Sequence, residues 1–245
     1  NGRALLKPAQ EHSEAVTRGN SVSEGAGTVP HGRGAHHEAG AYHAHVMFGL
    51  NDHVPPTAVR QGDDNRMYSM QSWDEDKPPL AKSEAMQKML KNNTGVTGIV
   101  SGIINNCPAD KRDALKEKMM SHVAMSIVLN HNDAHMGNVL LSNDGTDVAF
   151  IDNTTTGGTG LEGHKNSVFQ SMHQSGMHTK IPDKLNERFS KTTFKDMQRG
   201  MGEHYKDWQV GQSFLRMRFA QTLQARDGKL NYEFFRPTTS TPHGH

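Results

Sequence analysis

The chain has 245 residues, enough for a sizeable core in one domain or in one domain divided into two lobes. Its 27 Lys and Arg residues almost balance its 26 Asp and Glu residues, so the charge points neither to nucleic acid nor to an anionic membrane. The single cysteine, Cys107, excludes an intramolecular disulfide, and without a visible signal peptide or a bilayer-spanning apolar run we expect a cytoplasmic or otherwise intracellular protein.

The first part of the chain predicts short strands around one helix. A helix is expected over residues 36–48, because Ala39, Tyr42 and Val46 recur at helical spacing. The other predicted elements are a strand at residues 4–7, a flexible loop at 9–35, a helix-breaking segment at 54–57, and two strands within 57–73 joined by a polar turn at 62–65.

The second part is mainly helical. Its clearest helix covers residues 110–129, with Asp110 as the expected N-cap and a stripe of apolar side chains at i, i+4 spacing, namely Leu115, Met119, Val123 and Ile127. Two apolar runs, 139–141 and 148–151, flank a turn at 143–145 and predict a hairpin. Further helices are expected at 183–191, 193–205 and 209–226, before a polar tail.

Three polar residues around this hairpin have the types and spacing that phosphoryl transfer needs. The reaction requires a carboxylate for the attacking hydroxyl, oxygen ligands for Mg²⁺, and a cation for the phosphates. Asp133 and Asn138 lie five positions apart after the long helix, and Asp152 follows the hairpin. The spacing alone is a weak signal, and the helix before it and the hairpin after it strengthen it.

Several short motifs carry a resemblance to the protein-kinase-like superfamily. Residues 131–140, His-Asn-Asp-Ala-His-Met-Gly-Asn-Val-Leu, resemble its catalytic loop, in the form found in aminoglycoside and related small-molecule kinases. Residues 151–153, Ile-Asp-Asn, are similar to the metal-binding segment of type II phosphatidylinositol 4-kinases. Segments 5–8, 37–42, 54–57 and 181–185 resemble, in the same order, motifs of phosphoinositide-kinase-like, actin-fragmin-kinase-like and HipA-type kinases.

The resemblance implies an α+β, two-lobed protein-kinase-like fold. A reduced small lobe would cover residues 1–73, and a mainly helical large lobe would cover 74–245. It implies ATP and Mg²⁺ as cofactors, with Mn²⁺ as an alternative metal, and transfer of the γ-phosphoryl group to a hydroxyl. We rank protein Ser/Thr first as the acceptor, and a phosphoinositide or a small molecule second. The sequence sets no oligomeric state.

The resemblance also assigns roles by position. Lys7 would hold the α- and β-phosphates, and Glu38 would pair with it. Asp133 would be the catalytic carboxylate, while Asn138 and Asp152 would bind the metal. The hinge that presents backbone groups to adenine would comprise Met70, Gln71 and Ser72.

The amino-terminal end departs from the kinase pattern. Only six residues precede Lys7, so the chain lacks the usual glycine-rich phosphate loop, either because it is a piece of a longer protein or because the lobe is reduced. The glycines at 25, 27, 32 and 34 follow the lysine and do not match that loop in position. Residues 154–160, rich in threonine and glycine, occupy the place of an activation segment.

Two other interpretations stay open. The chain could be a pseudokinase that has lost turnover and acts as a binding scaffold. Alternatively, His131, Asp133 and His135 alternate along one loop and could converge on zinc, which would indicate a hydrolase. A zinc enzyme should copurify with stoichiometric zinc and ignore ATP, which separates it from the kinase interpretation.

Overall fold

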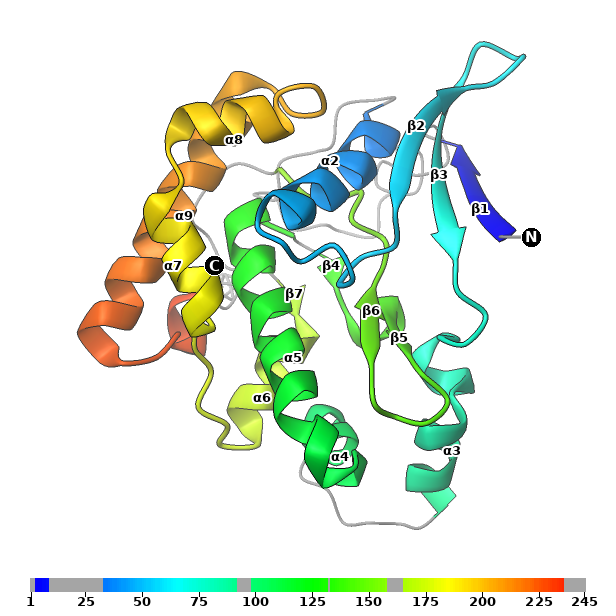
Figure 1. Ribbon diagram of the computed structural model, residues 1–245, viewed down its shortest axis with the longest axis vertical. Helices are drawn as coiled ribbons and strands as arrows, with labels where there is room; N and C mark the ends of the chain where they lie inside the picture. The colour runs from blue at the N-terminus through cyan, green and yellow to red at the C-terminus, as the bar shows by residue number, and fades with distance from the viewer. Residues whose placement is uncertain (1–2, 9–32, 92–97, 132, 158–164, 236–245) are drawn as a thin grey trace, which may run out of the picture.

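The computed structural model describes residues 3–8, 33–91, 98–131, 133–157 and 165–235, which form a mixed fold of helices and small sheets (Figure 1). The strands are β1 (Arg3–Pro8), β2 (Thr57–Gln61), β3 (Met67–Trp73), β4 (Asp133–Ala134), β5 (Val139–Leu141), β6 (Val148–Phe150) and β7 (Lys165–Asn166). The α-helices are α2 (Gly34–Met47), α3 (Glu84–Lys91), α4 (Ile99–Asn106), α5 (Ala109–Leu129), α6 (Ser167–Gln174), α7 (Asp183–Lys191), α8 (Phe194–Met201) and α9 (Asp207–Asp227). Short 3₁₀ turns are η1 (Leu80–Lys82), η2 (Met136–Asn138) and η3 (Tyr232–Phe234).

The first three strands form an antiparallel sheet in the order β1-β3-β2, with α2 packed against it. The predicted strands and the turn between β2 and β3 are confirmed, with Asn65 in the left-handed conformation that the turn requires. The predicted stripe on α2 is partly wrong, because Val46 is 43% exposed. The helix buries small residues, which allow its backbone to lie close to its neighbours, and it also buries polar side chains, among them His37 and Glu38.

Helix α5 is the centre of the hydrophobic core (Figure 1), with α9 on one side and β6 on another. All four residues of its predicted stripe are buried, and from Lys118 onward the helix is buried on every side. The N-cap prediction is wrong: Pro108 holds that position, and Asp110 lies in the first turn, where a carboxylate faces the positive end of the helix dipole. At the other end, Asn130 adopts a left-handed conformation and terminates the helix.

The predicted hairpin is confirmed as β5 and β6, paired antiparallel with Val139 opposite Phe150. Its tight turn includes Gly145, whose φ of 74° suits glycine. The ring of His122, from α5, stacks on Phe150 with 3.5 Å between ring centroids. Because β6 pairs with β5 and packs against α5, the position from which Ile151 and Asp152 continue the chain is fixed.

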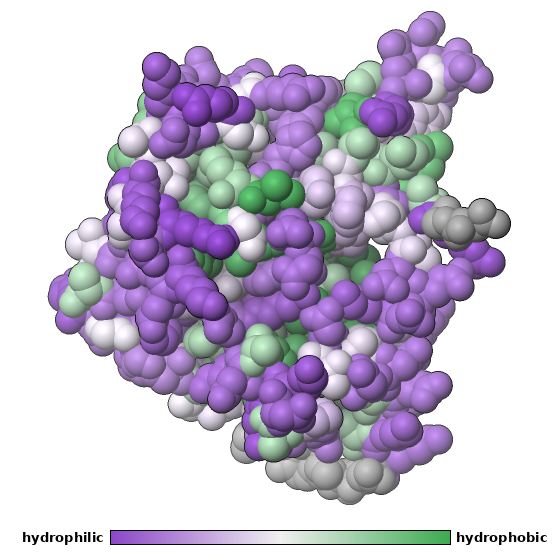
Figure 2. Space-filling view, in the orientation of Figure 1, coloured by the Kyte–Doolittle hydropathy of each residue, from purple (hydrophilic) through white to green (hydrophobic). Residues whose placement is uncertain are grey.

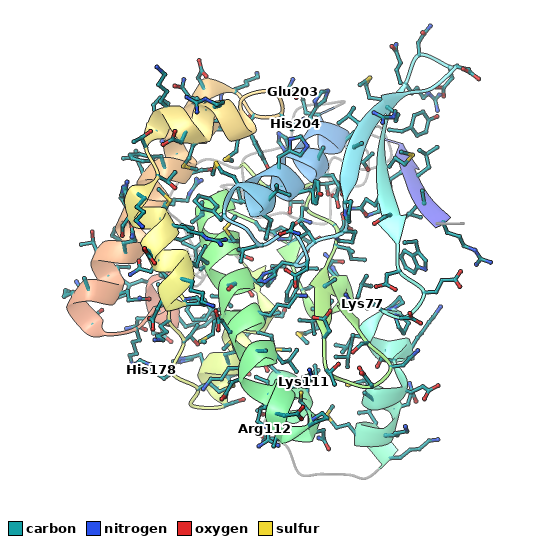
Figure 3. All side chains as sticks on the ribbon, in the orientation of Figure 1. Lys77, Lys111, Arg112, His178, Glu203 and His204 are labelled. Carbon is teal, nitrogen blue, oxygen red and sulfur yellow. The ribbon has the colours of Figure 1, made fainter. Side chains whose placement is uncertain are left out.

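The segment after β3 is bonded to this hairpin. Leu141 N donates to the carbonyl of Pro78 at 3.1 Å, and Lys77 Nζ lies 2.6 Å from Asp147 Oδ2. Figure 3 shows Lys77 beside the hairpin. Lys118 of α5, which is buried, joins the same network at 2.7 Å from Asp147 and 3.0 Å from Asp52. Burial acts to raise the pKa of Asp147, but hydrogen bonds from the two lysines hold it below its usual value.

We expect Lys118→Ala to lower the free energy of unfolding by about 2 kcal/mol, because it removes a buried ammonium and leaves two carboxylates without their shared partner. Urea unfolding followed by circular dichroism measures this. Lys111→Ala, on the exposed first turns of the same helix (Figure 3), should change the value by less than about 0.5 kcal/mol. Equal effects of the two substitutions would contradict the expectation.

The carboxyl-terminal third of the chain is helical, and its helices α6 and α9 pack against α5. Helix α6 was not predicted from the sequence. Helix α8 begins with a capping box, in which Thr193 and Asp196 bond each other's backbone N–H groups. Helix α2 contacts both the sheet and α8, so the region before residue 74 touches the helical region along this helix. The division into lobes at residue 73 stays a prediction.

Within the described ranges, no helix combines the length and apolar character that crossing a bilayer needs. Figure 2 shows a face that is largely hydrophilic, with scattered hydrophobic areas.

Candidate active site

Lys7 and Asp152 lie far apart in the sequence and meet beside α2. Lys7 Nζ lies 3.9 Å from Asp152 Oδ1. The side chain of Lys7 is 15% exposed and that of Asp152 is 31% exposed, so the pair is shielded but open to solvent on one side. The edge strand β1 positions the lysine, and the end of β6 positions the aspartate.

The backbone at Asp152 is held in an uncommon conformation. Its φ of 62° lies in the left-handed region, which aspartate tolerates better than most residues. The ring of His131 donates from Nε2 to the carbonyl of Asp152 at 3.0 Å. Burial lowers the pKa of His131 to about 4, so the ring is neutral at pH 7. Thr154 Oγ1 donates to Asp152 Oδ1 at 3.1 Å, and both contacts orient the carboxylate.

The loop with Asp133 and Asn138 is tied to this aspartate. Asn138 Nδ2 donates to the carbonyl of Asp133 at 3.0 Å, which leaves the amide oxygen Oδ1 for another partner. Ile151 N donates to the carbonyl of Asn138 at 2.9 Å, so Asn138 and Asp152 lie at the same end of the hairpin. The carboxylate of Asp133 is half-exposed, 3.8 Å from the ring of His135. The three residues that the sequence singled out therefore belong to one connected loop region.

Glu38 lies behind Lys7, in the layer between α2 and the sheet. It is 1% exposed, and Gln71 Nε2 of β3 donates to its Oε1 at 2.5 Å. Burial raises the pKa of Glu38 to about 7, against the lowering effect of the Lys7 charge and with a further rise from Asp152. The expected direct pair of Glu38 with Lys7 is not among the contacts of the described residues. Lys7 instead pairs with Asp152, and its charge interacts with Glu38 at longer range, where it acts to lower the pKa of Glu38.

The donor atoms here suit a hard cation. Magnesium binds oxygen ligands and usually takes one or two carboxylates together with substrate phosphates. Asp152 offers a carboxylate, and Asn138 offers an amide oxygen that has no hydrogen bond among the residues that the structure describes. These are the two residues that would hold the metal.

The structure does not suit the hinge prediction. Met70, Gln71 and Ser72 lie in β3, the central strand of the sheet. Gln71 is opposite Leu5 of β1 and Thr57 of β2, so the backbone groups here are used within the sheet. Backbone N–H and C=O groups that contact adenine must not be used in the sheet. Beyond Trp73, where β3 ends, the chain leaves this sheet, so its backbone groups are not paired with β1 or β2.

The zinc interpretation gains nothing from the geometry. His131 is buried and bonded to the carbonyl of Asp152, whereas His135 is half-exposed and accepts a hydrogen bond from Gly137 N at Nδ1. Among the residues that the structure describes, no group of three His, Cys, Asp or Glu side chains could hold a metal ion.

Three residues at the site were missed by sequence reasoning: His37, Tyr205 and Gln209 contact the segment after Asp152. No sequence signal marks the last two, because they lie 49 and 52 positions from the residues that they contact in that segment. Of the glycines discussed above, Gly34 begins α2, and those at 25, 27 and 32 lie outside the described residues, as do residues 158–160 and almost all of the predicted flexible loop.

Neither a protein-family model nor a curated protein sequence matches this chain. Among solved structures it is similar to the crystal structure of a Helicobacter pylori proinflammatory kinase, CtkA, with 10% sequence identity and a TM-score of 0.44. The match covers 78% of this chain and 80% of that chain. This is a weak likeness.

Proposed function

We propose that this protein is an ATP- and Mg²⁺-dependent phosphotransferase that moves the γ-phosphoryl group to a hydroxyl acceptor. The observation that supports this most is the 3.9 Å approach of Lys7 Nζ to Asp152 Oδ1, with the Asn138 loop bonded to the same end of the hairpin. A cation for phosphates and oxygen ligands for a metal are the parts that phosphoryl transfer requires.

Each residue has a distinct task in this proposal. Lys7 binds the α- and β-phosphates, and Glu38 behind it steadies its charge. Asp133, whose carboxylate is half-exposed, orients the acceptor hydroxyl and takes its proton. Asn138 and Asp152 hold Mg²⁺, which when bound neutralises charge on the phosphates. Catalysis would come mainly from positioning and charge neutralisation.

For the acceptor we rank protein Ser/Thr first, and a phosphoinositide or a small molecule second. The exposure of Asp133 supports a bulky acceptor, because its carboxylate can be reached from the surface. Mn²⁺ is the alternative metal, and adenine would contact the segment after β3.

The purified chain is tested with Mg²⁺ and γ-labelled ATP against three acceptors in parallel: basic and acidic test proteins, phosphoinositide vesicles, and aminoglycosides. We expect label on protein, and a rise in melting temperature with Mg·ATP, because a ligand that binds only the native state stabilises it. A shift without transfer to any acceptor would favour the pseudokinase scaffold. If neither a shift nor transfer is seen, nucleotide binding itself is refuted.

A further inference from the structure

Tyr205 is a buried side chain without a part in the chemistry described so far. It follows α8 and is 2% exposed. Its hydroxyl oxygen lies 2.7 Å from Thr156 Oγ1 and 3.1 Å from the carbonyl of His37 in α2. Burial raises the pKa of Tyr205 above its ordinary value, so the hydroxyl keeps its proton at any working pH.

The ring of Tyr205 lies in a slot between two glycines. A Cβ at Gly40 of α2 would collide with its Cε2 atom, and a Cβ at Gly157 would lie 2.9 Å from its Cε1 atom. The ring of His37 stacks on the same side chain, with 5.2 Å between ring centroids. Figure 3 shows Glu203 and His204 beside α2, so the loop that carries Tyr205 lies against this helix.

Thr156 links the tyrosine to the turn that follows Asp152. Thr156 Oγ1 donates to the carbonyl of Asn153 at 2.8 Å, and its backbone N–H donates to the same carbonyl at 3.2 Å. Asn153 is the residue directly after Asp152, so the tyrosine hydroxyl, the threonine hydroxyl and this peptide form a short relay. The relay ends one peptide from the carboxylate.

Gln209 of α9 holds the far end of the same segment. Its Nε2 donates to the carbonyl of Gly157 at 2.9 Å and lies 3.4 Å from His37 Nε2, while its Oε1 accepts from Lys206 N at 2.9 Å. Gly157 N in turn donates to the carbonyl of Leu129 at 2.7 Å. Both ends of the segment 152–157 are therefore fixed, one by β6 and the other by α5 and α9.

We propose that Tyr205, through Thr156, is a positioning residue that sets the conformation of residues 152–157 and thereby the orientation of the Asp152 carboxylate. The left-handed backbone at Asp152 is uncommon for this residue type and needs such support from its surroundings. This inference rests on the proposed function, because it gives the carboxylate its metal-holding task.

The first test uses Tyr205→Phe and needs neither metal nor nucleotide. Hydrogen exchange of the peptide that covers residues 150–157 should be about tenfold faster in the variant, because Thr156 Oγ1 loses its hydrogen-bond partner at 2.7 Å. Exchange in α5 should stay unchanged. The matched control is Tyr68→Phe, which removes a hydroxyl bonded to Asp64 at 2.8 Å on the exposed β2–β3 turn and should leave residues 150–157 unaffected.

The second test measures the Mg²⁺ concentration that gives half of the ATP-induced rise in melting temperature and half of the maximal transfer rate. In Tyr205→Phe we expect this concentration to rise about tenfold, because a displaced carboxylate binds the cation less well. Thr156→Val should give the same rise, and Thr156→Ser, which keeps the hydroxyl, should restore the wild-type value. The threonine variants test the same contact if the tyrosine variant does not fold.

A purely structural role would lower the melting temperature of the variants and leave both the local exchange and the Mg²⁺ concentration as in the wild type; that result would overturn the inference. If wild-type protein shows no shift and no transfer, the proposed function fails, and the hydrogen-exchange test alone decides whether Tyr205 sets the conformation of residues 152–157. If wild-type protein is active and Thr156→Val matches it, only the positioning role is lost.

Discussion

Asp152→Asn is expected to lower the transfer rate about a thousandfold or more while the protein stays folded. The substitution keeps the shape of the side chain but removes the charge that faces Lys7 at 3.9 Å and that would hold the metal. Asp133→Asn should have an effect of similar size, since it removes the carboxylate that would take the proton of the acceptor. Initial rates with labelled ATP at saturating Mg²⁺ measure both variants.

The matched control is Asp183→Asn, at the exposed start of α7, where the carboxylate makes only a surface pair with Lys180. It should retain wild-type turnover. Melting temperatures within a few degrees of wild type would show that the losses come from chemistry and not from unfolding. If both Asp133→Asn and Asp152→Asn keep near wild-type rates, the assignment of the active site is wrong.

The second large effect is a loss of folding stability at acidic pH. Burial is the main cause that lowers the pKa of several histidines, among them His37, His45 and His131 to about 4, and His53 to about 3. In the unfolded chain each would take up a proton near pH 6.5. The stability that they contribute is therefore complete above pH 6.5 and is lost as the pH falls from 6.5 to about 4.

A shift of this size corresponds to about 3 kcal/mol for one histidine. Glu38 acts in the opposite direction, since its raised pKa of about 7 favours folding as the pH falls through the same range. Because Glu38 offsets about one of the four histidines named above, a loss of free energy of unfolding equal to that from about three histidines remains. This loss is comparable with the whole stability of a typical domain. We expect cooperative unfolding between pH 6 and 4.

The measurement is the free energy of unfolding in urea at a series of pH values from 7.5 to 4.5. His45→Gln, which replaces a buried ring that bonds the carbonyl of Ala41 within α2, should flatten the pH dependence by about one proton. His178→Gln, at an exposed position (Figure 3), should leave the slope unchanged. Equal slopes for the two variants would contradict the role of burial.

The fold was predictable where local pattern and tertiary environment agree. The turn at 62–65, the hairpin after Asn138 and the long helix that precedes Asp133 follow from turn chemistry and apolar spacing. Helix α6, which is eight residues long, was not predicted. The exposed Val46 shows that a spacing match over thirteen residues does not fix which face of a helix is buried.

The site was predictable to the extent that it is carried by contiguous motifs. The loop with Asp133 and Asn138, the hairpin and Asp152 lie within twenty positions, so their proximity follows from one local structure. The hinge assignment stays a prediction that the sheet order does not support, because a strand that looks terminal in the sequence is central in the sheet, and sheet order is set by long-range pairing. Tyr205 reaches the site only through tertiary packing, which no single-sequence pattern encodes.

The segment that joins β3 to the hairpin, residues 74–79, limits how the sheet and the hairpin can move relative to each other. From Asp76 to Pro79 it is hydrogen-bonded to β5 and to the β5–β6 turn: Asn143 N donates to the carbonyl of Asp76 at 3.3 Å, and Pro79 forms a β-bridge with Leu140. A swing of the Lys7 strand away from Asp152 cannot pivot there without breaking those bonds. On this connection, a movement of the sheet relative to the hairpin would have to bend before Asp76, at Asp74 and Glu75.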